Sequence, residues 1–143
     1  MPAYPPLSTQ VIGKAESALG ALLAPVLAEA GLTFPEWLIF VLATAQGGAA
    51  GRAALVAAIA DARKLDPAEV ATAIGALAAT GDLEADDAQV TLTSRGRARH
   101  QRVRTRLDEV TTAIFDFPAD DLAVAGRVLG VITERANAVL AAG

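Results

Sequence analysis

Apolar residues recur every three or four positions through the first thirty residues, which is the spacing of one face of an α-helix. The stripe consists of Ile12, Ala15, Leu19, Leu22 and Val26. Gly31 ends the segment, and Thr33, followed by Pro35 and Glu36, has the pattern of a helix N-cap. The spacing predicts a first helix from about Ser8 to Ala30 and a second helix directly after it.

The middle of the chain reads as three closely spaced helices. The run "PEWLIFVLATA" is apolar nearly all round, which predicts a buried second helix, and "QGGAAG" breaks it. A third helix covers roughly Arg52 to Arg63. Asp66 and Pro67 form another N-cap pair and open a fourth helix to about Thr80, which Gly81 ends. The inward face of the fourth helix consists of Val70, Ile74 and Leu77.

Two short strand-like pieces follow, "LEA" and "QVTLT", joined by Asp86 and Asp87. This arrangement is typical of a small β-hairpin. Three helices and a hairpin in this order predict a mainly α protein with a winged helix-turn-helix and a small β-hairpin wing.

The C-terminal third predicts two more helices, one from about Ser94 to Phe115 and one from Pro118 to about Ala142. Apolar residues repeat in the last helix with seven-residue spacing at Leu122, Ala125, Leu129, Ile132, Ala136 and Val139. Such a seam requires a partner helix. We therefore expect residues 1–32 and 94–143 to form a helical dimerisation region, and residues 33–93 to form the winged lobe. Packing of the terminal helices on their own chain is the alternative.

The composition narrows the possible chemistry. The 143 residues are 53% hydrophobic, yet only 4% are aromatic, and Cys is absent. An Ala-rich core buries little area per residue, so a subunit interface would add stability. Without Cys, and with His100 as the only histidine, disulfides, thiol nucleophiles and metal sites rich in Cys or His are excluded. Because the sequence has no phosphate-binding loop and no base near a serine, we expect that the protein is not an enzyme and binds no metal or cofactor.

The N-terminus lacks the basic-then-apolar layout of a secretion signal. The early apolar run "ALGALLAPVLAEAGL" is short and interrupted by Pro25 and Glu29, so we do not expect it to span a membrane. These features predict a cytoplasmic protein without a membrane partner.

Charge is unevenly distributed around a net value of −4. The stretch Leu65–Thr93 contains no Lys or Arg and carries six acids: Asp66, Glu69, Asp82, Glu84, Asp86 and Asp87. Six of the twelve basic residues follow directly, between Arg95 and Arg106. At about 100° per residue, the residues Arg95, Arg99, Arg102 and Arg106 share one helical stripe beside an apolar seam. We expect the arginines from Arg99 to Arg106 to pair with Asp or Glu, and an anionic ligand or acidic partner is the alternative.

Three segments have a characteristic order and spacing: "GLTFPEWLIFVLATAQGG", "IADARKLDPAEVATAIGALAATGDLE" and "VTLTSRGRARH". Over nearly the whole chain, this order and spacing resemble those of MarR-type transcriptional regulators. The patterns "GLT-P-W" and "LT--GR" are the most specific pieces. The resemblance implies a homodimer whose winged helix-turn-helix lobes bind a palindromic double-stranded DNA operator. It also implies release of DNA when a small phenolic or similar aromatic compound binds between the two regions.

The resemblance assigns the helix Pro67–Thr80 as the recognition helix. Contacts to bases and phosphates would come from Ala68, Glu69, Ala71 and Thr72, next to the N-cap Asp66. Phosphate contacts would come from Arg63, Lys64, Arg95 and Arg97, because the turn after the wing lies close to the DNA backbone in the family. Two departures stand out: the recognition face lacks basic residues, and the wing tip is Asp86-Asp87-Ala88, where family members usually carry Arg.

These departures affect affinity more than sequence reading. A Glu can accept a hydrogen bond from cytosine N4, and Ala can contact thymine methyl groups. Most of the affinity for DNA, however, comes from neutralisation of phosphates by Lys and Arg. We therefore expect the wing to serve a structural purpose without insertion into DNA.

The resemblance also implies an effector cavity, for which Phe34, Trp37, Phe40 and His100 are the candidates. An ordinary aromatic core is the alternative for these four residues. The leading hypothesis is a MarR-type homodimeric DNA-binding regulator, acting as a repressor and responding to a small aromatic or anionic effector. The rival is a winged-helix dimer that has lost strong DNA binding and acts through protein contacts.

Overall fold

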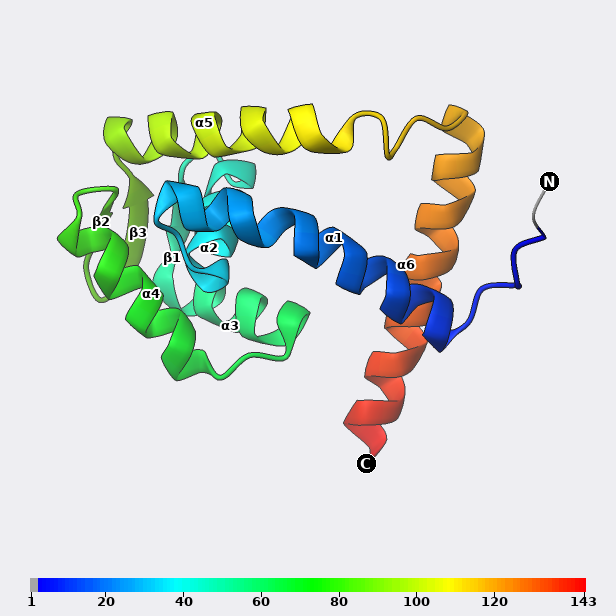
Figure 1. Ribbon diagram of the computed structural model, residues 1–143. Helices are drawn as coiled ribbons and strands as arrows, with labels where there is room; N and C mark the ends of the chain where they lie inside the picture. The colour runs from blue at the N-terminus through cyan, green and yellow to red at the C-terminus, as the bar shows by residue number, and fades with distance from the viewer. Residues whose placement is uncertain (1–2) are drawn as a thin grey trace. The chain divides into compact units, whose positions relative to one another are not determined.

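The computed structural model describes residues 3–143, which form six helices and three strands (Figure 1). In chain order they are α1 (Thr9–Ala30), α2 (Phe34–Ala45), β1 (Ala49–Gly51), α3 (Arg52–Arg63), α4 (Pro67–Ala79), β2 (Leu83–Ala85), β3 (Gln89–Leu92), α5 (Ser94–Thr111) and α6 (Ala119–Ala142). The chain divides into two compact units, residues 1–110 and residues 111–143. The predicted mainly α fold with a small winged lobe is confirmed.

Three helices begin with a capping side chain, and two of these caps, Thr33 and Asp66, lie where the sequence predicts them. The Ser8 hydroxyl accepts a hydrogen bond from the Val11 amide at 3.3 Å at the start of α1. Thr33 and Glu36 form a reciprocal capping box at the start of α2, with bonds of 2.9 and 3.3 Å. The Asp66 carboxylate accepts from the amide of Ala68 at 2.9 Å and caps α4. These side chains satisfy backbone donors that a helix start leaves free, which fixes the helix boundaries.

The sheet has one strand more than the sequence predicts. The glycines of "QGGAAG" indicate a break, and Gly47 and Gly48 do adopt positive φ of 84° and 99°. They turn the chain into β1, which pairs antiparallel with β3, and β3 pairs with β2 on its other side. The hairpin is therefore anchored to the rest of the lobe through β1.

The core of the lobe lies between α2, α3, α4 and the sheet. Its fully buried side chains include Phe40, Ile39, Leu55, Ile59, Ile74, Leu77, Val70 and Val90. The three residues predicted as the inward face of α4 are all in this set. The predicted burial of α2 is confirmed for Trp37, Ile39, Phe40 and Ala43.

The first helix contributes little to this core, since its only buried residues are Val26 and Leu27. With 22 residues and a mean hydropathy of 1.5, α1 is long and apolar enough to cross a membrane by length and composition alone. The helix begins at Thr9 and continues through Pro25 and Glu29 to Ala30, so these two residues do not interrupt it. The expectation that it does not span a membrane stays a prediction. Leu19 and Leu22, from the predicted stripe, are exposed.

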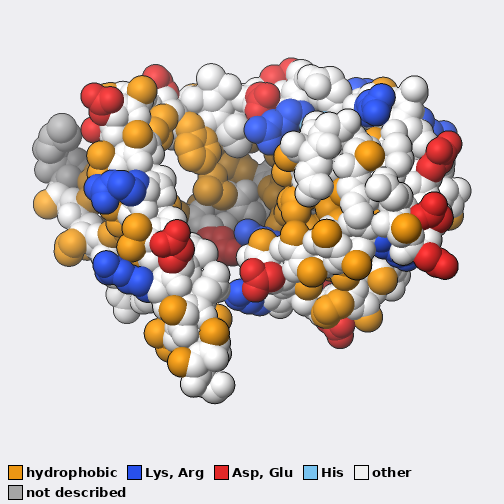
Figure 2. All heavy atoms as spheres, turned by 180° about the vertical axis from the view of Figure 1, so that it is seen from behind, with side chains coloured by type: hydrophobic (Ala, Val, Ile, Leu, Met, Phe, Trp, Pro, Cys, Tyr) orange, Lys and Arg blue, Asp and Glu red, His pale blue; other side chains and the backbone are white. Residues whose placement is uncertain are grey.

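The last helix carries its apolar seam at the surface. No residue of α6 is buried, and Leu122, Leu129, Ile132 and Val139 of the seam are exposed. Figure 2 shows hydrophobic side chains at the surface of this part of the chain. The preceding helix, α5, ends at Thr111 instead of the predicted Phe115, because Ile114 and Phe115 both donate to the Thr111 carbonyl in a turn. The heptad stripe of α6 is therefore available to a partner helix.

Candidate nucleic-acid interface

The N-terminal half of α4 presents the predicted recognition face to solvent. Ala68, Glu69 and Thr72 are exposed, and Ala71 is half-buried. The Thr72 hydroxyl donates to the Ala68 carbonyl at 2.9 Å, so the oxygen keeps only acceptor capacity towards a base edge. The face therefore offers methyl groups and acceptors.

A hollow of about 490 Å³ lies between this face and the start of α2. Its lining consists of Thr33, Pro35, Glu36, Ala68, Glu69, Thr72, Ala73 and Ala76. The two ionisable groups among these residues are both carboxylates, which gives the hollow an acidic character.

The wing tip is organised by one of its own carboxylates. Asp86 accepts hydrogen bonds from the backbone amides of Ala88 at 2.8 Å and Gln89 at 2.7 Å. Both hydrogen bonds hold the pKa of Asp86 below its usual value, and the bond from Gln89 has the larger effect. The charge of Arg52 lowers this pKa to a smaller extent. Asp86 thus closes the hairpin turn, which agrees with a structural purpose for the wing.

Arg52 brings a positive charge to this acidic tip. Its backbone amide donates to the Ala88 carbonyl at 2.9 Å, and its Nη1 donates to the Asp86 carbonyl at 3.4 Å. In the sequence, Arg52 only marks the start of the third helix. Its position at the wing tip follows from the pairing of β1 with β3, which periodicity does not reveal because β1 has three residues.

Arg95 and Arg97 lie at the other end of the hairpin. Arg95 Nε is 3.7 Å from a carboxylate oxygen of Asp82, just before β2. The Arg97 guanidinium packs against Gly48, where an added Cβ would come 2.8 Å from its Nη2. The Leu92 amide, at the end of β3, donates to the Gly48 carbonyl, whereas the Arg52 amide donates to the carbonyl of Ala88, just before β3. Arg97, which packs on Gly48, and Arg52 therefore lie at opposite ends of β3.

The predicted pair Arg63 and Lys64 is held by surface contacts. Arg63 Nη2 is 3.4 Å from Glu16 Oε1 of α1, and its guanidinium lies over the Phe34 ring at 4.8 Å. Lys64 ends α3 in the left-handed conformation, and its Nζ is 3.3 Å from Asp61 Oδ1. Exposed ion pairs contribute little stability, so both cations can exchange these carboxylates for phosphates.

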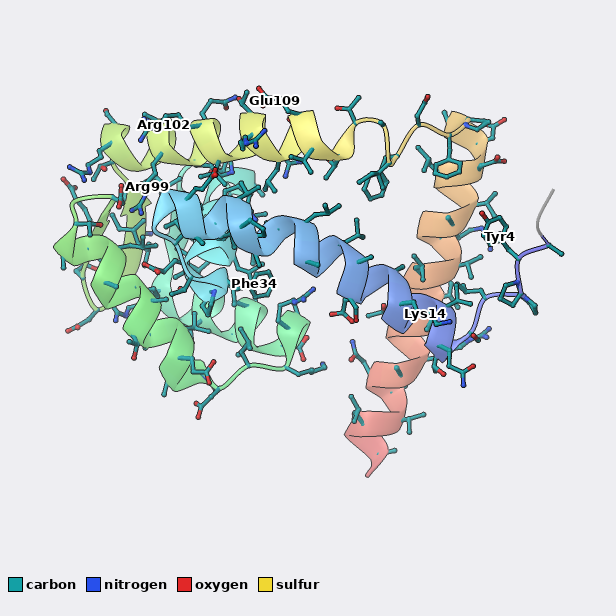
Figure 3. All side chains as sticks on the ribbon, in the orientation of Figure 1. Tyr4, Lys14, Phe34, Arg99, Arg102 and Glu109 are labelled. Carbon is teal, nitrogen blue, oxygen red and sulfur yellow. The ribbon has the colours of Figure 1, made fainter. Side chains whose placement is uncertain are left out.

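Behind the interface, a buried ion pair joins the wing to α5. Asp82 is fully buried, and its Oδ2 accepts from Arg99 Nη1 and from the Thr80 hydroxyl, both at 2.6 Å. Arg99 Nη2 also donates to the carbonyls of Ala30 at 2.7 Å and Gly31 at 3.2 Å (Figure 3). One guanidinium thus connects α5, the start of the wing and the end of α1. Although Asp82 belongs to the acidic stretch Leu65–Thr93, its carboxylate therefore does not add to the surface charge of that stretch.

Small residues allow the backbones to meet at the same place. A Cβ on Gly96 would overlap the Asp82 carbonyl oxygen, so only glycine fits there. The Thr93 hydroxyl donates to the Gly81 carbonyl at 2.6 Å and accepts from the Gly96 amide at 3.1 Å. The pattern "LT--GR" therefore corresponds to the packing of α5 on the wing.

The aromatic candidates for an effector cavity only partly come together. His100 stacks on Trp37 with ring centroids 5.2 Å apart, and the Phe40 centroid is 6.3 Å from that of His100. Burial, and secondarily the charge of Arg104, lower the pKa of His100. Trp37 and Phe40 belong to the core, whereas Phe34 packs under Arg63.

The remaining arginines of α5 differ in their partners. Arg104 and Arg106 form exposed pairs on their own helix, with Asp108 at 3.6 Å and Glu109 at 3.4 Å. The expected pairing with acids is therefore found for Arg99, Arg104 and Arg106. Within residues 3–143, the Arg102 side chain forms no ion pair or hydrogen bond, and no cluster of three or more His, Asp or Glu side chains suits a metal ion.

Comparisons with known proteins agree on the fold. No family model matches the chain, and no curated protein sequence matches it. The structure of NadR with 4-hydroxyphenylacetate is similar with a TM-score of 0.71 at 19% identity, covering 93% of this chain and 98% of that one. A MarR-family transcriptional regulator from Rhodococcus sp. gives 0.65 at 19%, covering 90% and 96%.

The Mycobacterium tuberculosis MarR family protein Rv2887 is also similar in two complexes. With DNA the TM-score is 0.60 at 23% identity, covering 91% of this chain and 98% of that one. With salicylic acid it is 0.57 at 24%, covering 84% and 96%. The chain has the winged helix fold of the MarR-family transcriptional regulators.

Proposed function

We propose that the chain is a homodimeric DNA-binding transcriptional regulator of the MarR type, acting as a repressor in the cytoplasm and responding to a small aromatic or anionic effector. The observation that carries this proposal is the exposed N-terminal face of α4 beside a three-stranded wing. The likeness to Rv2887, solved with DNA and with salicylic acid, and to NadR, solved with 4-hydroxyphenylacetate, supports both parts. A regulator also agrees with the absence of an enzymatic motif in the sequence.

In this proposal the base contacts come from α4. Ala68 and Ala71 contact thymine methyl groups, Glu69 accepts from a cytosine amino group, and Thr72 accepts through its free lone pair. These groups supply sequence preference and little affinity.

The affinity comes from cations around the acidic face. Arg52, beside the wing tip, is the added candidate, and Lys64 lies two residues before the cap of α4. Arg63, Arg95 and Arg97 remain proposed phosphate contacts. Arg95 and Arg97 lie at the base of the hairpin, away from Arg52. Substitutions at the two places can therefore compare how much each cation contributes to the affinity for DNA.

The dimer would form through the terminal helices. The exposed seam of α6 and the exposed Leu19 and Leu22 of α1 supply apolar surface that a second copy can cover. A membrane is the competing partner for α1, but it leaves the heptad pattern of α6 unexplained, whereas a second copy accounts for both helices. A two-fold symmetric dimer would place two α4 helices on a palindromic operator.

The aromatic effector pocket is proposed at Phe34, Trp37, Phe40 and His100. His100 stacks on Trp37, so an aromatic compound enters there by replacing the imidazole ring against the indole. Such a replacement would move α5 relative to α2, the two helices that carry these rings.

A second candidate function rests on the acidic recognition face. Glu36 and Glu69 line the hollow beside α4, and the stretch Leu65–Thr93 contains no Lys or Arg. A winged-helix dimer with this face would dock a basic protein segment instead of DNA.

Selection from DNA fragments distinguishes the two functions. Purified protein is incubated with a randomised duplex library at about 50 mM salt, where electrostatic attraction is strong, and the bound fraction is sequenced. The proposal predicts enrichment of one palindromic sequence. A bound fraction with the composition of the input library would refute sequence-specific DNA binding and favour the protein-docking function.

A further inference from the structure

Residues 66–72, at the start of α4 and all within the described part of the chain, expose acceptors and methyl groups but no free donor. The amide of Ala68 donates to the Asp66 carboxylate at 2.9 Å, and the amide of Glu69 donates to the Asp66 carbonyl at 3.0 Å. The Thr72 hydroxyl donates to the Ala68 carbonyl at 2.9 Å. The ionised Glu69 carboxylate only accepts. This part of α4 therefore offers a base edge oxygen lone pairs and the methyl groups of Ala68 and Thr72.

The acceptor and the methyl groups share one side of the helix. At about 100° per residue, Thr72 lies about 40° around the helix from Ala68 and about 60° from Glu69, one turn further along. All three line the hollow of about 490 Å³ beside α2, together with the apolar Pro35 and Ala73. The bond to the Ala68 carbonyl also fixes the rotamer of Thr72, so its methyl group has one direction. A carboxylate and an apolar surface thus lie side by side at an open space.

The edges of the bases in the major groove differ in how well they match this arrangement. Guanine presents two acceptors, and thymine presents an acceptor beside its methyl group, so both lack a donor for a carboxylate. Adenine and cytosine present a donor but no methyl group. Methylation at N6 of adenine or N4 of cytosine replaces that donor. The base whose edge combines an N4–H donor with a methyl group is 5-methylcytosine.

We propose that α4 reads 5-methylcytosine in the operator: the amino group of the base donates to Glu69, and its methyl group packs against Thr72 and Ala68 beside the hollow. An unmethylated cytosine in the same place leaves this apolar surface in contact with water, whereas the methyl group covers it. This inference rests on the proposed function, since it specifies the base that the recognition helix reads. Methylation of the operator therefore changes its affinity for the regulator.

Modified operators test the reading of the base. The randomised library is prepared with unmodified and with 5-methylated cytosine, and the operator selected from either is resynthesised. Each cytosine position of the half-site is then occupied in turn by cytosine, 5-methylcytosine, N4-methylcytosine or thymine, and fluorescence anisotropy measures the Kd at one salt concentration.

We expect one position at which 5-methylcytosine lowers the Kd by about fourfold for each half-site, the effect of burying one methyl group. N4-methylcytosine at the same position should bind at least about tenfold more weakly than cytosine, because Glu69 loses its donor. Equal binding of cytosine and 5-methylcytosine at every position would refute the inference and leave the proposed DNA binding intact. Tighter binding of N4-methylcytosine than of cytosine would also refute it. Failure to bind any form would refute the proposed function as well.

Substitutions in α4 separate the donor from the methyl group, and both positions are exposed, so the variants should fold. Thr72→Ser keeps the hydroxyl and removes the methyl group, so the preference for 5-methylcytosine over cytosine should fall below about twofold. Thr72→Val is the control, because it keeps the branched side chain and should keep this preference. Glu69→Ala should abolish the preference for 5-methylcytosine over thymine, since both bases carry the methyl group. Equal preferences in Thr72→Ser and Thr72→Val, or an unchanged one in Glu69→Ala, would contradict the assignment.

Discussion

Arg99 and Asp82 form an ion pair with an Nη1–Oδ2 distance of 2.6 Å, and the carboxylate of this pair is fully buried. The same guanidinium binds the last carbonyls of α1. The pair therefore holds three parts of the fold in one place: the end of α1, the start of the wing and α5.

Removal of Arg99 should destabilise the lobe strongly. In Arg99→Leu the buried Asp82 loses its charged partner, and we expect a loss of roughly 3 kcal/mol in the free energy of unfolding. Arg95→Leu is the control, because Arg95 lies 3.7 Å from the same carboxylate but is 69% exposed, and its loss should cost less than about 1 kcal/mol. Urea denaturation measures both, and equal losses would contradict a special role for Arg99.

Gly96→Ala should also destabilise the protein. The new Cβ would overlap the Asp82 carbonyl oxygen, so backbone must move, at a cost of about 1–3 kcal/mol. Gly75 of α4 has no atom within 4 Å of an added Cβ, so Gly75→Ala should stabilise by roughly 0.5–1 kcal/mol through helix propensity. Thermal denaturation measures the stability of both variants. A Gly96→Ala protein as stable as the wild type would mean that α5 does not pack closely against the wing at this point.

His100 should make stability depend on pH. Burial lowers its pKa below the ordinary 6.5, so the unfolded chain takes up a proton that the folded chain does not. The contribution of His100 is therefore complete above pH 6.5 and is lost as the pH falls towards the folded pKa. His100→Phe keeps an aromatic ring on Trp37 and should show a smaller loss of unfolding free energy between pH 7.5 and 5.5. An identical loss in both proteins would show that His100 does not titrate in this way.

The seam of α6 should control the oligomeric state. Leu129 lies on the heptad stripe and Val124 lies outside it, although both are exposed in the single chain. Sedimentation should show a dimer for the wild type, a monomer for Leu129→Asp and a dimer for Val124→Asp, since a charge in a helix–helix seam opposes burial. Dissociation by Val124→Asp alone would place the interface elsewhere on α6.

The sequence contained most of the helical layout because its signals are local. Caps such as Thr33 with Glu36 and Asp66 with Pro67 act within one turn of chain, and the structure confirms them. The strand β1 gave no such signal, because three small residues become a strand only by pairing with β3.

The candidate site was harder to predict because it depends on contacts between distant residues. Asp82 looks like a surface acid of a charged wing until its partner, seventeen residues away, is known. Arg52 looks like the start of a helix until the hairpin places the wing tip beside it, 34 residues away. Charge counts could show that the recognition face is acidic, and the fold was needed to show which cations surround it.

The most direct test of DNA binding is a fluorescence anisotropy titration of the selected palindromic duplex with wild type, Arg52→Gln and Arg95→Gln between about 50 and 200 mM salt. We predict specific wild-type binding that weakens as salt rises. Arg52→Gln, beside the wing tip, should reduce the salt slope by about one phosphate contact, and Arg95→Gln should have a smaller effect. Wild-type protein that does not bind the duplex even at about 50 mM salt would contradict a DNA-binding regulator.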